Sequence, residues 1–176
     1  FCGGAVGYAA YDAIRYVERL PKAPPDELGA PDLFFAFYDL MVVFDHLNKT
    51  ILVICCAQVE GENPREAYQK AVRRIDEAVE RLRTPVTALS DDITPRGQVT
   101  IPFTSNFRKE EFCKAVERCK EYIRAGDIFQ VVLSQRLVAK TKAKPFDVYR
   151  ALRVINPSPY MFFLSMGEFR LVGSSP

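Results

Sequence analysis

Apolar residues recur every three or four positions between residues 63 and 83, and this spacing predicts an amphipathic helix. The segment begins with Asn63-Pro64-Arg65-Glu66, where asparagine caps, proline occupies the first turn and glutamate takes the capping-box position. The apolar stripe consists of Tyr68, Val72, Ile75, Val79 and Leu82. Charged residues fill the opposite face, so we expect the helix to dock on one side and to face solvent on the other.

The second half of the chain contains two further helical patterns. One follows Asn106 and stops at Gly126, a residue type that favours the C-terminal end of a helix. Its apolar positions are Phe112, Val116, Cys119 and Ile123. The other begins at Pro145 and ends at Asn156-Pro157. Its core side is formed by Phe146, Tyr149 and Leu152.

In the first half, β-branched and aromatic runs predict strands over residues 33–44 and 50–57. The five residues between them, Asp45–Lys49, are typical of a hairpin connection. A short helix is expected over residues 11–20, upstream of a proline-rich loop.

Strands are also predicted near the C-terminal end. Residues 129–138 alternate between apolar and polar side chains, and residues 160–164 and 168–172 flank a short turn. Strands and helices follow one another in an order that indicates an α+β fold with largely antiparallel sheets and packed helices.

Charge and composition exclude several classes of function. The 24 lysines and arginines balance 22 acids, giving a net charge of +2, and the two signs are interleaved. A nucleic-acid-binding surface would need a concentrated basic excess, so none is expected. No apolar run approaches the roughly 20 residues of a membrane span, so no membrane association is expected either.

Cysteine usage indicates a reducing compartment. The five cysteines form no C-x-x-C pair, and the chain has one histidine, so a zinc site is not expected. Free thiols fit a cytoplasmic protein. Three prolines between residues 84 and 104 interrupt the regular pattern and predict a boundary between two structural units.

Candidate chemistry is sparse. His46 lies in the predicted hairpin connection, where a turn residue is a better interpretation than a catalytic base. The end, Gly173-Ser174-Ser175-Pro176, suits either an anion-binding turn or a simple turn. The polar face of the predicted 129–138 strand, formed by Gln130, Ser134 and Arg136, suits either a bound carboxylate or an internal salt bridge.

A stiff corner stands out in the sequence Asn156-Pro157-Ser158-Pro159-Tyr160-Met161-Phe162-Phe163. Two proline rings fix the backbone, and an aromatic and a thioether follow at once. Such a corner suits a flat apolar ligand, although a loop that enters a core strand is the simpler alternative.

This corner and two flanking motifs resemble those of chorismate-utilising enzymes. The first motif spans residues 125–136, and Leu171-Val172-Gly173-Ser174-Ser175-Pro176 follows the corner at the family's spacing. Gly3-Gly4-Ala5-Val6-Gly7-Tyr8 is similar to the family's preceding domain. Within the family, the residues in these motifs are most similar to those of the anthranilate synthase component I branch.

The resemblance implies a partial chorismate-binding-enzyme fold and a division of the chain. Residues 1–95 would be the C-terminal part of the N-terminal regulatory domain, 96–105 a linker, and 106–176 the start of the chorismate-binding catalytic domain. A first residue other than methionine and an end at a glycine-serine turn lead us to expect a fragment that lacks both termini.

The resemblance also implies a function for the parent protein. It would convert chorismate and ammonia to anthranilate and pyruvate in tryptophan biosynthesis, with Mg²⁺ as cofactor and a glutamine amidotransferase subunit as partner. Tryptophan would inhibit it at Pro159, Tyr160 and Met161, with Asn156 and Ser158 in support. Catalytic residues and metal ligands are expected beyond Pro176, so residues 1–176 alone are expected to be inactive.

Two alternatives stay open at this stage. One is a fragment of an aminodeoxychorismate or isochorismate synthase, from the same family. The other is a non-catalytic module that binds aromatic amino acids.

Overall fold

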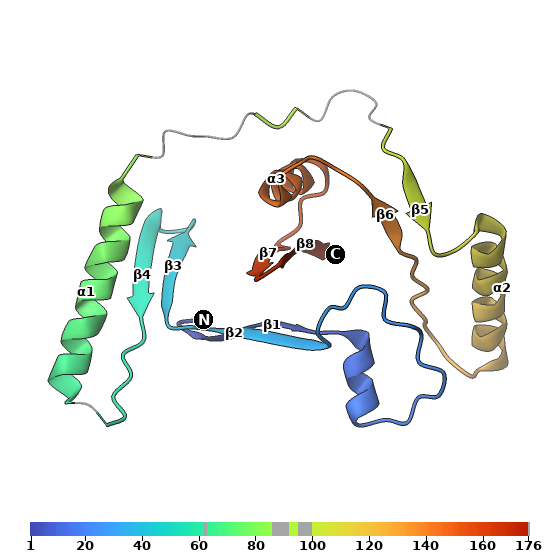
Figure 1. Cartoon of the computed structure of the whole chain (residues 1–176), viewed down its shortest axis with the longest axis horizontal. Helices are drawn as coiled ribbons and strands as arrows, with labels where there is room; N and C mark the ends of the chain where they lie inside the picture. Colours follow the sequence, from blue (N-terminus) through green and yellow to red (C-terminus); the bar gives the residue numbers. More distant parts are fainter. Residues whose placement is uncertain (62, 86–91, 95–99, 176) are drawn as a thin grey trace. The chain divides into compact units, whose positions relative to one another are not determined.

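The computed structural model describes residues 1–61, 63–85, 92–94 and 100–175 (Figure 1). The chain divides into two compact units, Phe1–Leu89 and Ser90–Pro176, which are described separately. Residues 96–99 of the predicted linker, 96–105, lie outside the described residues. Its last three residues, 103–105, form a strand.

Where the structure describes it, the first unit contains two antiparallel ladders. Strand β1 (Gly4–Ala9) pairs with β2 (Leu33–Tyr38), and β3 (Leu40–Asp45) pairs with β4 (Thr50–Cys55). The prediction of one strand over residues 33–44 is therefore wrong, because Asp39 separates two strands that have different partners. The hairpin between β3 and β4 is confirmed, and its connection follows Asp45.

The expected helix over residues 11–20 is shorter than predicted. It is a 3₁₀ helix, η1 (Tyr11–Tyr16), and Arg15 donates a hydrogen bond to Asp12 within it. A 3₁₀ helix stays short because its hydrogen-bond geometry is poorer than that of an α-helix.

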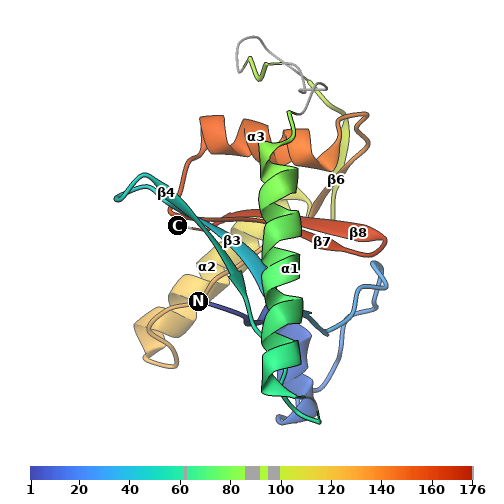
Figure 2. The ribbon, with the colours of Figure 1, turned by 90° about the vertical axis from the view of Figure 1, so that its left-hand side faces the viewer.

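Helix α1 (Pro64–Arg83) packs on β4, as Figures 1 and 2 show. The Asn63 side chain accepts a hydrogen bond from the Arg65 N–H at 3.0 Å, which confirms the predicted start. The buried positions are Ala67 and Ala71, 3% and 8% exposed, whereas Tyr68 of the predicted stripe is 67% exposed. The stripe is thus wrong in detail: the small residues let the helix approach the strand.

In its described residues, the second unit contains two more antiparallel pairs. Strand β5 (Phe103–Ser105) pairs with β6 (Leu137–Ala139), and β7 (Tyr160–Met166) pairs with β8 (Phe169–Ser175). The predicted strand over 129–138 is wrong for most of its length, since β6 covers only its last residues. A strand extends only as far as a neighbouring strand forms hydrogen bonds with it. The partner of β6 is β5, which has three residues, so β6 is equally short.

The described residues of this unit also form two helices. Helix α2 (Lys109–Ala125) ends at Gly126, whose φ of 81° is left-handed, and the Asp127 N–H bonds the Tyr122 carbonyl at 3.0 Å. Helix α3 (Pro145–Ile155) lies on the β7–β8 hairpin, where the rings of Phe146 and Phe163 meet edge-on at 5.3 Å. The predicted α+β class with antiparallel sheets is confirmed.

Candidate functional site

The proline-rich corner joins helix α3 to strand β7. The Asn156 N–H donates to the Leu152 carbonyl at 2.8 Å and closes the helix. Ser158 lies between the two prolines, and Tyr160 is the first residue of β7. The corner thus lies at one end of the β7–β8 hairpin, with α3 leading into it (Figure 2).

Two serine hydroxyls bind the corner to the end of β8. The Ser158 hydroxyl donates to the Ser175 carbonyl and accepts from the Tyr160 N–H, the latter at 3.1 Å. The Ser174 hydroxyl donates to the Asn156 carbonyl at 2.7 Å. One bond runs from the corner to the strand and the other from the strand to the corner, so the two segments are bridged in both directions.

Tyr160 and Met161 point to opposite faces of the hairpin, because successive strand residues alternate. Phe163 contacts the rings of α3, so Met161, two residues earlier, shares the helix-covered face. Tyr160 is 67% exposed on the other face. A ligand that contacts both side chains would therefore approach along the end of β7 rather than over one face.

Beside the corner, an aromatic ring covers a glycine. Phe162 pairs across the ladder with Gly173, and a Cβ added at Gly173 would overlap the tip of the Phe162 ring. Glycine in this register lets the ring lie flat across the strand pair.

The end of the chain is not the turn that was predicted. Gly173, Ser174 and Ser175 belong to β8, where Ser174 pairs with Met161 and Ser175 with Tyr160. Ladder pairing to the corner, together with the serine bonds, holds them extended. Pro176 lies outside the described residues.

Other candidate residues are placed as follows. His46 lies in the β3–β4 connection, as predicted, where the Asp45 carboxylate accepts the N–H groups of Asn48 and Leu47 at 2.9 Å each. Those bonds lower the pKa of Asp45, with the Asn48 N–H as the largest cause.

Gln130, Ser134 and Arg136 do not share a strand face, since they precede β6.

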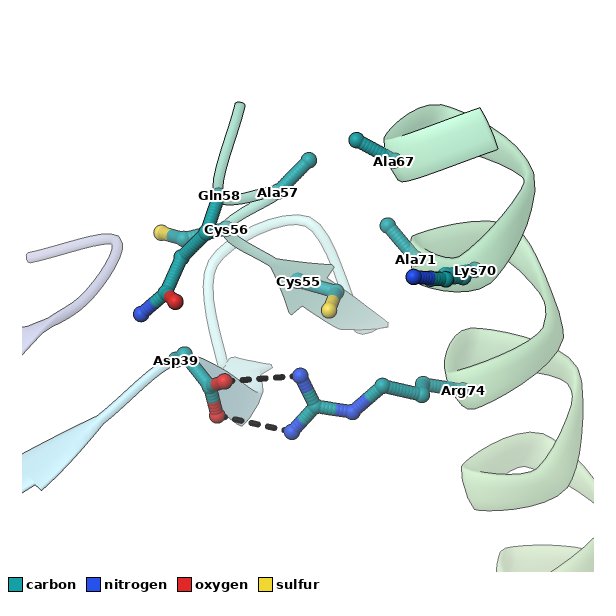
Figure 3. Close-up of a pocket in the computed structure, with 9 residues that line it drawn as sticks. All are labelled: Asp39, Cys55, Cys56, Ala57, Gln58, Ala67, Lys70, Ala71 and Arg74. Atoms are coloured by element: carbon teal, nitrogen blue, oxygen red, sulfur yellow. Dashed lines mark hydrogen bonds and ion pairs between the residues drawn. The ribbon is translucent and has the colours of Figure 1, made fainter. Parts of the chain in front are cut away.

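A pocket of about 190 Å³ lies in the first unit between α1 and the end of β4 (Figure 3). Arg74 donates two hydrogen bonds of 2.7 Å to the two carboxylate oxygens of Asp39, which lowers the pKa of Asp39. Ala67 and Ala71 lie on the same helix as Arg74 and also line the pocket. Sequence analysis missed this ion pair, because no local pattern connects residues 35 positions apart.

The described residues do not fit a magnesium site. Within them, no group of three or more histidine, cysteine, aspartate or glutamate side chains could hold a metal ion. All five cysteines, which lie in the described ranges, are free thiols. Nor is any helix in those ranges both long and apolar enough to cross a membrane.

Comparison with known proteins identifies the family. A family model described as chorismate binding enzyme matches residues 2–176. The chain belongs to the chorismate-binding enzyme family. It is similar to anthranilate synthase component 1 of Acetivibrio thermocellus, with 48% identity covering 100% of this chain and 36% of the relative. The Thermus thermophilus protein of the same name is 46% identical with the same coverage of 100% and 36%.

A solved structure has a similar fold. Anthranilate synthase component I from Streptococcus pneumoniae matches with a TM-score of 0.80 and 35% identity, covering 100% of this chain and 39% of that one. The chain therefore spans little more than a third of the length of its relatives, 36% for the first two above. The expected chorismate-binding fold, in part, is confirmed.

Proposed function

We propose that this chain is part of the large subunit of an anthranilate synthase, a lyase of tryptophan biosynthesis. The reaction joins chorismate and ammonia and releases anthranilate, pyruvate and water. The similarity over the whole chain to relatives named anthranilate synthase component 1 carries the proposal, at 48%, 47% and 46% identity. Names with a component number also imply a second component, which we propose to be a glutamine amidotransferase that supplies the ammonia.

The described surface fits a chain that packs against further parts of a large subunit. Phe37 and Phe129 are 85% and 93% exposed, and each sheet has two strands among the described residues. Exposed aromatic residues of this size favour a contact surface. We propose that residues 1–95 belong to the regulatory domain, 96–105 to a linker and 106–176 to the catalytic domain.

We propose that tryptophan binds at Pro159, Tyr160 and Met161, with Asn156 and Ser158 holding the corner in shape. The first support is chemical: a proline ring, a phenol and a thioether offer apolar and polarizable contacts to an indole. The second is geometric. Among the described residues β7 pairs only with β8, so its other edge offers backbone N–H and C=O groups to an amino acid's carboxylate and ammonium.

We propose that the residues that act on chorismate lie after Pro176 in the parent protein. Mg²⁺, which would neutralise the substrate's carboxylate, has no fitting ligand set among the described residues. We also propose a cytoplasmic location, because free thiols persist in a reducing compartment.

The dependence on the nitrogen source tests this proposal. The full-length protein that contains this sequence is expected to form anthranilate from chorismate with an ammonium salt, and from glutamine only when the amidotransferase subunit is added. Glutamine use without a second subunit would contradict the proposed partnership. A different aromatic product would contradict the proposed reaction.

A further inference from the structure

We propose that Cys2 and Cys56 are a site of reversible oxidation, at which a peroxide converts two thiols to a disulfide. The two residues lie 54 positions apart in the chain, and both thiols are free and exposed. The proposal concerns the first unit and does not depend on the reaction that the parent protein catalyses.

The first support is a direct contact between the two residues. The Cys56 thiol donates a hydrogen bond to the backbone carbonyl of Cys2 at 3.0 Å. A carbonyl oxygen lies about 2.4 Å from its own Cα, so the Cα of Cys2 is within about 5.5 Å of the Cys56 sulfur. Because both side chains are exposed, each sulfur can turn about its Cα–Cβ bond toward the other.

The second support is the glycine beside Cys2. A Cβ added at Gly3 would lie 2.6 Å from the Cys56 sulfur, and the φ of Gly3 is 151°, a backbone conformation that favours glycine. Any other residue at this position would push the Cys56 thiol away from Cys2. Gly3 therefore keeps open the space in which the two cysteines meet.

The third support is the place of the pair in the fold. Cys56 follows β4, and its N–H donates to the Asp39 carbonyl at 2.7 Å. Cys2 precedes β1, whose first residue, Gly4, pairs with Tyr38. The end of β4 and the start of β1 thus lie beside consecutive residues, and a disulfide would join the two ladders there. Such a cross-link stabilises a fold mainly because it restricts the unfolded chain.

The neighbouring thiol of Cys55 provides an internal comparison. Figure 3 shows the Cys55 side chain directed toward α1 and the Cys56 side chain directed away from that helix. Cys55 is also less exposed than Cys56. Two adjacent cysteines therefore differ in their access to Cys2.

Hydrogen peroxide is the oxidant, and the reaction balances in two steps. One thiolate attacks the O–O bond, becomes a sulfenic acid and releases hydroxide, which takes up a proton to give water. The other thiolate attacks the oxidised sulfur, the S–S bond forms and a second water leaves. The two sulfurs lose two electrons, which the peroxide gains. Dithiothreitol reverses the reaction by thiol–disulfide exchange.

Peptide mapping of the full-length protein that contains this sequence tests the pair. After treatment with hydrogen peroxide, mass spectrometry of a non-reduced tryptic digest should detect the peptide that holds Cys2 linked to residues 50–65. Dithiothreitol should separate the two peptides. Since Cys55 and Cys56 share the peptide 50–65, variants identify the linked sulfur. The link should persist in Cys55→Ser, the matched control, and be absent from Cys2→Ser and Cys56→Ser.

The urea midpoint gives a second measurement on the same proteins. Peroxide should raise the midpoint of the wild type and of Cys55→Ser, and leave that of Cys2→Ser unchanged. Before oxidation the three proteins should unfold at the same midpoint, which shows that the variants fold.

Absence of the link from the oxidised wild type would overturn the proposal, as would a link that persists in Cys56→Ser. A rise of the midpoint in Cys2→Ser equal to that of the wild type would also overturn it. None of these measurements depends on anthranilate formation, so the proposed function stands or fails separately.

Discussion

The guanidinium of Arg74 binds the carboxylate of Asp39 through both terminal nitrogens, at 2.7 Å each. Asp39 separates β2 from β3, and Arg74 lies in the middle of α1. The ion pair therefore connects this helix to the residue at which the chain passes from the β1–β2 ladder to the β3–β4 ladder (Figure 3). The fork of an arginine matches a carboxylate in a way that a lysine cannot.

The first prediction concerns the pH dependence of this pair. Arg74 lowers the pKa of Asp39 below its ordinary 3.8, so the ionised form stabilises the folded state. That contribution is complete above pH 3.8 and is lost as the pH falls through the lower folded pKa. Asp39→Asn should therefore lower the urea midpoint of the full-length protein near neutral pH, and the difference from wild type should vanish in acid. A difference that persists unchanged in acid would contradict this account.

The second prediction compares two glycines in close contact. A Cβ at Gly7 would overlap the backbone carbonyl of Phe34, whereas one at Gly173 would meet the movable tip of the Phe162 ring. Backbone cannot move aside as a ring can, so Gly7→Ala should cost about 3 kcal/mol of unfolding free energy and Gly173→Ala about 1 kcal/mol. Denaturant titration of both variants checks the order, and equal costs would argue against it.

The third prediction concerns the start of α2. Arg108 is the N-cap residue and its side chain makes no capping hydrogen bond, because a guanidinium has donors only. The Glu111 carboxylate lies 3.4 Å from the Arg108 N–H, which leaves half of a capping box in place. Arg108→Ser should complete the box and stabilise the protein by about 1 kcal/mol, with Arg108→Ala as the control that should not. Equal urea midpoints for the two variants would refute the prediction.

The fourth prediction concerns tryptophan binding at the corner. Met161→Ala removes the thioether proposed to contact the indole. A buried methionine side chain is worth about 1.5–3 kcal/mol, so the tryptophan concentration for half-maximal inhibition should rise at least about tenfold. Met41→Ala, a methionine truncation in β3, should leave that concentration unchanged. Unaltered inhibition in Met161→Ala would remove this residue from the site.

Local signals made parts of the fold predictable from sequence. Asn63 and Pro64 define the start of α1, Gly126 the end of α2, and Pro145 the start of α3, because capping depends on neighbouring residues. Pairing between distant segments is not encoded locally. The segment 129–138 alternates between apolar and polar residues as a strand does, but only its end pairs with another strand. The run 33–44 forms two strands that separate at Asp39 because each pairs with a different partner.

The candidate site was predictable to a similar degree. The proline spacing and the family resemblance locate the corner, and its stiffness follows from the rings. The bond from Ser158 to Ser175 joins residues 17 apart, and the placement of Tyr160 and Met161 on opposite faces depends on where β7 begins. Neither follows from the sequence pattern alone.

Product analysis of the full-length protein tests the central claim most directly. With chorismate, an ammonium salt and Mg²⁺, the account predicts anthranilate and pyruvate in equal amounts, and loss of both when tryptophan is added. Accumulation of aminodeoxychorismate or isochorismate, or turnover that tryptophan leaves unchanged, would contradict it.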